Sequence, residues 1–485
     1  MSLLLGTDLP EIRRAAVFGL ARSGRAAVNA LLERGVEVVA TDAKEAGQLP
    51  GLGAPREGLT YVLGGHPESL LSGVDLVVVS PGIPLLLPVF DTARARALPV
   101  VSEVELASRL VPGLVVGITG TNGKSTTTAL AAALLAASGR AAVACGNFGT
   151  PWISYAGRGA LPADGAPRTW VVELSSFQLE GIRRFAPDVA VHLNLTPDHL
   201  DRYRSLDDYG AAKARIFENQ NDAQVAVLNA DDPLVARVQP RARRLEFSRR
   251  GARPRGAWFA GESFVADVDG KGARTVAART DLALPGAHNV ENALAALAAT
   301  LPLGVTAEAA VEAFRSFRGL PHRTALVRVR AGVSWYDDSK GTNVDATLKS
   351  LEGFPDGTVH VILGGKGKGD DYGRLRPLVA RKARRVLLIG AAGPSIGRAL
   401  GSLPGVEVVA CGTLERAVEE SAAAAGPGDV VLLSPACASF DQFRNFEHRG
   451  EVFEAFVTSL PEQPASAPAR GGGSGEPGDR VPLRH

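Results

Sequence analysis

The chain has 485 residues, which is too long for one hydrophobic core and predicts two or three domains. Its 53 basic and 51 acidic residues leave a formal net charge of +2, which excludes the strongly basic surface that nucleic acid or an anionic membrane would attract. The three cysteines are widely spaced, which predicts that they form no disulfides. The sequence shows no signal-peptide pattern and no apolar run near the ~20 residues of a membrane span, so we expect a cytoplasmic protein.

The first segment alternates short apolar strands with helices, which predicts a parallel sheet covered by helices. We expect strands at 15–18, 36–40 and 74–79 and a helix at 25–35. The turn at 19–24 resembles a dinucleotide-binding fingerprint but has Ala21 in place of the middle glycine. Asp42 follows about twenty residues later, where a ribose-binding acid lies in that motif. A nucleotide site and a tight turn without a ligand both remain open.

A strand at 114–116 leads into a glycine-rich turn and then into a helix that begins at Lys124. Backbone N–H groups of such a turn and of the helix N-terminus converge on one point, which favours a phosphate group. Lys124 adds a positive charge for the outer phosphates, and the Ser125 hydroxyl suits a Mg²⁺ ligand. The standard phosphate-loop pattern requires glycine at position 118, where this chain has Ile118. The sequence therefore predicts ATP binding, and a turn without a ligand is the alternative.

Two further strands end at polar residues. Glu173 follows a strand at 169–172 and is a candidate Mg²⁺ ligand, with a helix-capping acid as the alternative. Asp198 and His199 come shortly after a strand at 189–193 and suggest a second cation site or phosphate contacts. Lys213, judged by its spacing alone, is an ordinary lysine on a helix surface.

The pattern is less regular and strand-like over 257–276, and it becomes helical over 289–317. A third segment starts at 319, and we expect its strands at 359–363, 385–389 and 429–433. The glycine-rich run 363–369 contains Lys366 and Lys368 and predicts an anion site, with a surface turn as the alternative. Cys437 has no evident histidine partner, so we expect a buried, unreactive side chain.

Taken together, these motifs resemble the Mur ligases, the ATP-dependent amide ligases of peptidoglycan precursor synthesis. The resemblance covers about 19–446 and rests on stretches in all three segments, namely 120–126, 146–149, 173–179, 194–201, Lys213, 288–292, 322–323 and 338–343. The stretches 173–179, 363–368 and 433–443 are similar to the members that add D-glutamate. Lys366 departs from the family pattern, which commonly has an acidic residue there.

The resemblance implies an α/β fold of three domains. These are a Rossmann-like UDP-sugar-binding domain (1–110), a central P-loop ATPase-type domain with a mostly parallel sheet (111–318) and a Rossmann-like amino-acid-binding domain (319–460). The composition of 461–485, rich in Pro, Gly, Ser and Ala, predicts a disordered tail. It also implies transfer of the γ-phosphate of ATP to the carboxylate of UDP-N-acetylmuramoyl-L-alanine, followed by attack of D-glutamate on the acyl-phosphate. We expect two Mg²⁺ sites, a monomer, and neither nucleic acid nor membrane as a partner.

Site residues follow from the same resemblance. Catalysis is implied for Lys124, Glu173, His199 and Lys213, and the metal ligands are Ser125, Glu173, His199 and Lys213 as a carbamate. ATP is implied to bind Gly120, Thr121, Asn122, Gly123, Lys124, Ser125, Thr126, Asn289, Asn292, Arg323 and Asp338. The UDP substrate is implied to bind Gly19, Leu20, Ala21, Arg22, Asp42, Ser80, Pro81, Gly82 and Asn147, and D-glutamate to bind Thr342, Lys368, Ser439 and Phe446.

Three alternatives remain at this point. A ligase of the same or a folylpolyglutamate type would join another amino acid to another carboxylate. A nucleotide-dependent switch would hydrolyse ATP slowly and bind a partner through its first domain. An NAD-dependent oxidoreductase built on the turn at 19–24 is disfavoured by Ala21 and by the phosphate loop elsewhere in the chain.

Overall fold

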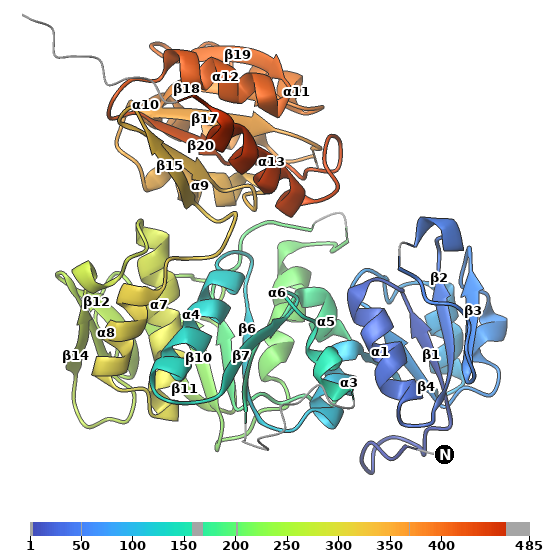
Figure 1. The fold of residues 1–485 in the computed structure, drawn as a ribbon. Helices are drawn as coiled ribbons and strands as arrows, with labels where there is room; N and C mark the ends of the chain where they lie inside the picture. The colour runs from blue at the N-terminus through green and yellow to red at the C-terminus, as the bar shows by residue number, and fades with distance from the viewer. Residues whose placement is uncertain (1–2, 50, 158–167, 200–201, 368, 462–485) are drawn as a thin grey trace, which may run out of the picture. The chain divides into compact units, whose positions relative to one another are not determined.

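The computed structural model describes residues 3–49, 51–157, 168–199, 202–367 and 369–461 (Figure 1). The chain divides into two compact units, Met1–Leu320 and Pro321–His485. The first unit contains a five-stranded and a nine-stranded sheet, and the second contains a six-stranded sheet. Within the described residues, the helices are too short or too polar to cross a bilayer.

The first sheet is wholly parallel, in the order β3-β2-β1-β4-β5. Its strands are β1 (Arg14–Phe18), β2 (Glu37–Asp42), β3 (Leu59–Leu63), β4 (Leu76–Val79) and β5 (Val100–Ser102), with helices α1 (Arg22–Leu32) and α2 (Pro88–Ala95). The strand order reverses between β1 and β4, and in open parallel sheets a ligand crevice forms at such a reversal. The turns that follow β1 and β4 are therefore placed to share one ligand.

The second sheet has the order β14-β13-β12-β11-β10-β9-β6-β8-β7, in which β13 pairs antiparallel with both β12 and β14 and the other strands pair in parallel. Its strands are β6 (Leu114–Thr119), β7 (Ala142–Gly146), β8 (Thr169–Glu173), β9 (Val189–His192), β10 (Val225–Asn229), β11 (Arg243–Ser248), β12 (Gly256–Ala260), β13 (Ser263–Asp267) and β14 (Arg274–Ala278). One face packs against α4 (Lys124–Ala137), α7 (Ala287–Thr300) and α8 (Ala307–Ser316). The other packs against α3 (Glu103–Leu110), α5 (Ser176–Glu180) and α6 (Leu206–Ala214).

The third sheet has the order β15-β16-β20-β17-β18-β19, in which only β15 is antiparallel. Its strands are β15 (Ala325–Arg330), β16 (Val333–Asp337), β17 (Val359–Gly364), β18 (Ala383–Ile389), β19 (Glu407–Gly412) and β20 (Val430–Leu433). Its helices are α9 (Val344–Glu352), α10 (Arg376–Lys382), α11 (Gly393–Leu400), α12 (Leu414–Ala424) and α13 (Phe446–Ser459). The central strands are apolar and buried on both faces, as expected for a parallel sheet covered by helices.

The predicted α/β class with mainly parallel sheets is confirmed, and every strand predicted from an apolar run is present. Helix α1 starts at Arg22, three residues before the predicted start, because the extended residue Ala21 already ends the turn. The strands that sequence reasoning missed include β3, β5, β7, β15 and β19, which all lie at sheet edges. The domain ranges 1–110, 111–318 and 319–460 stay a prediction, and the tail from 462 lies outside the described residues.

Candidate active site

The glycine-rich turn between β6 and α4 can be formed only by glycine at two positions. Gly120 has φ +151° and Gly123 has φ +83°, a backbone region that other residues rarely adopt. A Cβ at Gly120 would lie 2.8 Å from the Leu193 Cβ, and a Cβ at Gly123 would lie 2.3 Å from the Asn292 Oδ1. Helix α4 then begins at Lys124, so the turn and the helix N-terminus together form a concave backbone cradle for an anion.

Asn194, directly after β9, holds this loop in shape. Its Oδ1 accepts a hydrogen bond from the Asn122 N–H at 2.8 Å, and its Nδ2 donates to the Asn122 carbonyl at 3.1 Å. The Thr121 N–H also donates to the Asn194 carbonyl at 3.0 Å. The loop is therefore preorganised by protein contacts, and its binding of a phosphate requires little further ordering.

Two lysines converge on one carbonyl oxygen of the loop. The Nζ atoms of Lys124 and Lys213 each donate to the Gly120 carbonyl at 2.8 Å, and Lys124 also donates to the Thr121 carbonyl at 2.8 Å. Lys213 is buried, with its Nζ 4.5 Å from the Tyr209 ring centre. Burial, followed by the nearby positive charge of Lys124, lowers the pKa of Lys213 well below its usual value.

The interpretation of Lys213 as a helix-surface lysine is therefore wrong. The spacing of apolar residues in a short helix does not show that its carboxyl end lies under the phosphate loop, and the contact with Gly120 depends on tertiary packing.

Glu173, the last residue of β8, lies beside the first turn of α4. Its Oε2 accepts a hydrogen bond from the Ser125 Oγ at 2.5 Å, and its Oε1 accepts one from the Asn147 Nδ2 at 2.9 Å. The helix-capping alternative is wrong, because Ser175 caps α5. A buried carboxylate and a hydroxyl are the hard oxygen donors that Mg²⁺ prefers, so these residues fit that ion.

His199 lies in the loop after β9 with a left-handed backbone, φ +55°. Its carbonyl accepts hydrogen bonds from the N–H groups of Arg202, at 3.0 Å, and Tyr203, at 3.1 Å. Its Nε2 is 3.8 Å from the Asp198 Oδ2, and its ring is 4.9 Å from the Phe177 ring, centre to centre. The second cation site at His199 stays a prediction.

Helix α7 brings two predicted ATP-binding residues to the loop. The Asn292 Oδ1 accepts a hydrogen bond from the Thr127 Oγ1 at 3.3 Å, and its Nδ2 donates to the Asn289 Oδ1 at 3.1 Å. Thr126 is buried in the first turn of α4. These contacts place an amide pair against the side of the cradle.

The crevice of the first sheet is built from the turns after β1 and β4. The Ser80 Oγ donates to the Gly19 carbonyl at 2.8 Å, and a Cβ at Gly19 would lie 2.9 Å from the Ile83 Cγ1. Asp42 accepts from the Leu20 N–H at 2.7 Å through one oxygen and from the Lys44 N–H at 3.0 Å through the other. The structure thus assigns Asp42 a role in shaping the turn, whereas its contact with a ribose stays a prediction.

Two other residues predicted to contact the UDP substrate approach the central sheet. Arg22 donates through Nη1 to the Gly149 carbonyl at 3.3 Å, and Asn147 contacts Glu173 as described above. Pro81 and Gly82 lie in the turn after β4, where the Pro81 carbonyl accepts a hydrogen bond from Arg202 at 3.1 Å.

In the second unit, the loops after β16, β20 and β17 meet at one edge of the sheet. The Ala436 N–H donates to the Gly341 carbonyl at 2.9 Å, and the Lys366 N–H donates to the Ala438 carbonyl at 2.8 Å. Lys366 is exposed. Lys368, predicted to bind D-glutamate, lies outside the described residues.

Asp338 is the buried centre of this edge. Its Oδ2 accepts hydrogen bonds from the Ser350 Oγ at 2.6 Å and the Ser434 Oγ at 2.7 Å. Burial raises the pKa of Asp338 to about 6, although the two hydroxyls and the charge of Arg323 act in the opposite direction. The predicted residues Arg323 and Asp338 are therefore close enough for their charges to interact.

The predicted D-glutamate residues lie around the same loops. Phe446 starts α13, and its carbonyl accepts a hydrogen bond from the Ser339 Oγ at 2.9 Å. The Thr342 N–H donates to the Lys340 carbonyl at 2.8 Å, and the Lys340 Nζ lies 3.7 Å from the Phe446 ring centre. Ser439 is buried in the loop after β20.

Sequence reasoning missed Arg449, which is fully buried on α13. It donates to the Ser339 carbonyl at 2.7 Å and to the Cys437 carbonyl at 3.1 Å, and so ties together the loops after β16 and β20. Burial lowers its pKa to about 10. Cys437 is buried as expected, and burial raises the pKa of its thiol to about 11, which makes it a poor nucleophile.

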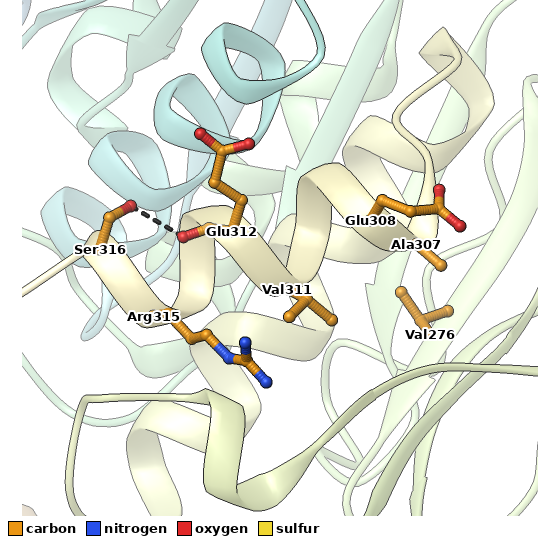
Figure 2. A pocket seen from close by; sticks show the side chains of 7 residues that line it. All are labelled: Val276, Ala307, Glu308, Val311, Glu312, Arg315 and Ser316. Carbon is orange, nitrogen blue, oxygen red and sulfur yellow. Dashed lines mark hydrogen bonds between the residues drawn. The ribbon is translucent and has the colours of Figure 1, made fainter.

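A surface hollow of about 710 Å³ lies on α8 and β14 (Figure 2). Its polar lining comes from Glu308, Glu312, Arg315 and Ser316, and the described part of its lining includes no predicted site residue. The Ser316 Oγ turns back to the Glu312 carbonyl at 2.9 Å. The hollow is thus separate from the chemistry described above.

Together, the glycine cradle, the lysine at its helix N-terminus and the acid–hydroxyl pair define a P-loop nucleotide-binding protein with an α/β fold. The particular family follows from comparison with known proteins. Three family models match the chain: Mur ligase MurD-like, N-terminal domain, at residues 13–102; Mur ligase middle domain, at 118–300; and Mur ligase, glutamate ligase domain, at 322–437. The chain belongs to the Mur ligase family, as the sequence motifs predicted.

Curated relatives are similar over nearly the whole chain. A UDP-N-acetylmuramoylalanine–D-glutamate ligase of Koribacter versatilis is 44% identical over 458 residues, covering 93% of this chain and 98% of the relative. A ligase of the same name from Anaeromyxobacter dehalogenans is 45% identical, with coverage of 93% and 98%. Membership of this ligase family rules out the oxidoreductase alternative.

Solved structures share the fold at low sequence identity. A MurF ligase from Thermotoga maritima in complex with ADP has a TM-score of 0.57 at 18% identity, covering 92% of this chain and 96% of that chain. A pseudomurein peptide ligase type C from Methanothermus fervidus also has a TM-score of 0.57, at 19% identity, with coverage of 92% and 99%.

Proposed function

We propose that this chain joins D-glutamate to UDP-N-acetylmuramoyl-L-alanine in an ATP-dependent reaction of peptidoglycan precursor synthesis, releasing ADP and phosphate. The observation that carries the proposal is the convergence of Lys124 and Lys213 on Gly120 beside the Glu173–Ser125 pair. The two substrates come from the names of relatives that are 44–45% identical over more than nine-tenths of the chain.

The chemistry requires activation of a carboxylate, because a carboxylate ion is a poor acylating agent. An oxygen of the alanyl carboxylate attacks the γ-phosphorus of ATP, the bond from phosphorus to the ADP oxygen breaks, and an acyl-phosphate forms. The amine of D-glutamate then attacks the acyl carbon, phosphate leaves with the bonding electrons of the carbon–oxygen bond, and the amine proton passes to solvent. Positioning and charge stabilisation by Lys124 and the backbone cradle contribute most to such a transfer.

Two Mg²⁺ sites are part of the proposal. Ser125 and Glu173 would hold one ion, and His199 with the carbamate of Lys213 would hold the other. Bound Mg²⁺ would offset the negative charge on the phosphoryl oxygens during transfer. The hydroxyl and carboxylate donors beside the cradle fit this role.

The carbamate explains why a lysine is buried under the phosphate loop. A neutral amine can attack CO₂ and become an anion, whereas the guanidinium of arginine stays protonated and positive. Burial of Lys213 and the neighbouring charge of Lys124 both favour the neutral amine. The carbamate of Lys213 would place a negative charge near the Gly120 carbonyl and the Lys124 ammonium group.

We further propose that the range 1–110 binds the UDP part in the crevice between β1 and β4, and that 111–318 binds ATP with the help of Asn289 and Asn292. The range 319–460 would supply Arg323 and Asp338 to ATP, and Thr342, Lys368, Ser439 and Phe446 to D-glutamate. The expected setting is the cytoplasm, with the chain acting as a monomer.

The deciding measurement is phosphate release with ATP, Mg²⁺, UDP-N-acetylmuramoyl-L-alanine and a panel of amino acids. We expect release to require both the UDP substrate and D-glutamate, with other amino acids at least about tenfold less effective. Equal release with and without D-glutamate would overturn the substrate assignment. Release that needs neither substrate would instead favour the nucleotide-dependent switch.

The carbamate is tested by Lys213→Arg, which keeps a positive charge but cannot be carbamylated. We expect kcat to fall about 100-fold or more, because an essential charge of opposite sign is lost, and we expect bicarbonate to restore part of the activity of Lys213→Ala. Lys382 is a second buried lysine, in α10, and Lys382→Arg is the matched control with near-normal activity. Near-normal rates for Lys213→Arg would remove the carbamate from the mechanism.

A further inference from the structure

Arg202 lies between the two ligand-binding regions of the first unit. Its Nη1 donates to the Pro81 carbonyl at 3.1 Å and its Nη2 to the Ile83 carbonyl at 3.4 Å, both in the turn after β4. Nη2 also donates to the Glu180 Oε2 on α5 at 2.8 Å. The Cζ atom lies 4.0 Å from the centre of the Phe177 ring, and the side chain is only 15% exposed. One guanidinium thus contacts the turn after β4 and helix α5 at the same time.

The backbone of the same residue holds His199. The N–H groups of Arg202 and Tyr203 both donate to the His199 carbonyl, and His199 has the left-handed φ of +55°. Phe177 packs against the guanidinium on one side and is 4.9 Å from the His199 ring, centre to centre. The Tyr203 hydroxyl donates to the Glu180 Oε1 at 2.5 Å. Arg202 and His199 are therefore held in a single packed group.

The other end of the contact is the turn over the crevice of the first sheet. Ile83 packs where a Cβ at Gly19 would be, and Ser80 donates to the Gly19 carbonyl. The turn after β1, which would bind the UDP part, is thus packed against the turn after β4, whose Pro81 and Ile83 carbonyls Arg202 contacts. A shift of this turn has to move the Arg202 side chain or break two hydrogen bonds to it.

We propose that Arg202 is a positioning residue that couples this turn to His199, so that binding of the UDP substrate tightens binding of the Mg²⁺–nucleotide at the phosphate loop. The identity of the two ligands rests on the proposed function. Arginine suits the role because its planar fork can donate to two carbonyls and a carboxylate while it stacks on an aromatic ring. Lysine has a compact ammonium group and cannot make all of these contacts from one position.

The coupling is measurable as a difference in affinity. Isothermal titration of the full chain with Mg²⁺ and a non-hydrolysable ATP analogue, with and without saturating UDP-N-acetylmuramoyl-L-alanine, gives the ratio of the two dissociation constants. Couplings between sites typically correspond to about 5- to 150-fold changes in affinity, and they are reciprocal. We expect at least about fivefold tightening in the native chain.

Arg202→Lys should reduce the ratio to about twofold or less, while the affinity for the analogue alone stays within about twofold of native. Arg204 is exposed two residues further on, and Arg204→Lys is the matched control that keeps the native ratio. Glu180→Gln replaces the charged partner of Arg202 with a neutral amide that can still accept a hydrogen bond. It should therefore lower the ratio of dissociation constants, but less than Arg202→Lys does. This variant also serves as the test if Arg202→Lys does not fold.

The coupling would be overturned if Arg202→Lys had the same ratio of dissociation constants as the native chain. If Arg202→Lys does not fold, the same outcome in Glu180→Gln would overturn it. A ratio of one in the native chain would do the same. If the native chain binds the UDP substrate and forms the amide product, these results leave the proposed function standing. If it does not bind the UDP substrate at all, the proposed function fails, and the coupling fails with it.

Discussion

The carboxyl edges of two parallel sheets, one in each unit, collect polar side chains but use their charges differently. In the first unit, the Nζ atoms of Lys124 and Lys213 meet at the Gly120 carbonyl. In the second, Asp338 is surrounded by the hydroxyls of Ser350 and Ser434, and the Arg449 guanidinium is held by backbone carbonyls. The first edge gathers two amines and the Glu173 carboxylate around one glycine-rich loop, whereas at the second edge the charged groups are hydrogen-bonded to neighbouring loops.

The difference indicates how each edge works. At the first edge the positive charge of Lys124 attracts an arriving polyanion, while burial favours the neutral amine of Lys213. At the second edge, internally hydrogen-bonded charges hold the loops in place. Substitutions at the first edge should therefore change activity more than stability, whereas those at the second should change stability at least as strongly.

The largest expected effect is that of Lys124→Met. Loss of the Lys124 ammonium group, which we propose to contact the phosphates of ATP, should lower kcat/KM by about 10²–10³-fold, as removal of one charge-stabilising donor does in other enzymes. The free energy of unfolding should change by less than about 1 kcal/mol, because Lys124 is only partly buried and loses only hydrogen bonds to two loop carbonyls. Steady-state kinetics and chemical denaturation measure the two quantities, with the exposed Lys44→Met as the control. A large loss of stability with retained activity would contradict the comparison.

At the second edge, the pH dependence of stability reports on Asp338. Its ordinary pKa of 3.8 is raised to about 6 in the folded chain, so between these values the folded state binds more protons than the unfolded state. The contribution of Asp338 to the free energy of unfolding should therefore be greatest below about pH 4. It should fall by about 3 kcal/mol as the pH rises past 6.

Asp338→Asn should abolish this contribution. The free energy of unfolding, measured with denaturant at pH 4 to 8, should therefore fall less steeply with pH in the variant than in the native chain. The substitution leaves a group of similar shape among the same hydroxyls. A variant that keeps the full native slope would show that Asp338 is not the titrating group.

The smallest expected effect is that of Gly123→Ala, which changes the shape of the phosphate loop at the first edge without changing its charge. Gly123 and Gly139 have almost the same left-handed φ, +83° and +82°, at the two ends of α4. An alanine at either position should cost about 1–2 kcal/mol of stability through backbone strain. Only at Gly123 would the new Cβ meet Asn292, so only Gly123→Ala should also weaken nucleotide binding. Nucleotide affinities measured by calorimetry for both variants test this, and equal affinities would argue against a shaped cradle.

Several features of the site could be predicted from the sequence because they are local. A glycine-rich turn between an apolar strand and a helix has few conformations, so residues 120–125 could be interpreted without the fold. Glu173 could be interpreted in the same way, because the end of a buried strand marks the ligand edge of a parallel sheet.

Other features depend on residues that are distant in the chain. Arg449 lies about a hundred residues from Ser339, and neither its spacing nor its helix indicates that it bonds to that loop. Arg202 similarly contacts carbonyls about 120 residues earlier. Backbone carbonyl acceptors have no side-chain signature, so sequence patterns cannot identify them.

By itself, the sequence determined the alternation of strands and helices, the phosphate loop and the family, since these depend on local periodicity and on motifs of adjacent residues. Only the tertiary structure decided that Lys213 is buried beneath Gly120, that Asp42 holds a turn, and that Arg202 links the turn after β4 to helix α5. Burial and contacts with the backbone depend on which elements pack together. Those properties set the pKa of Lys213 and the rigidity of the site.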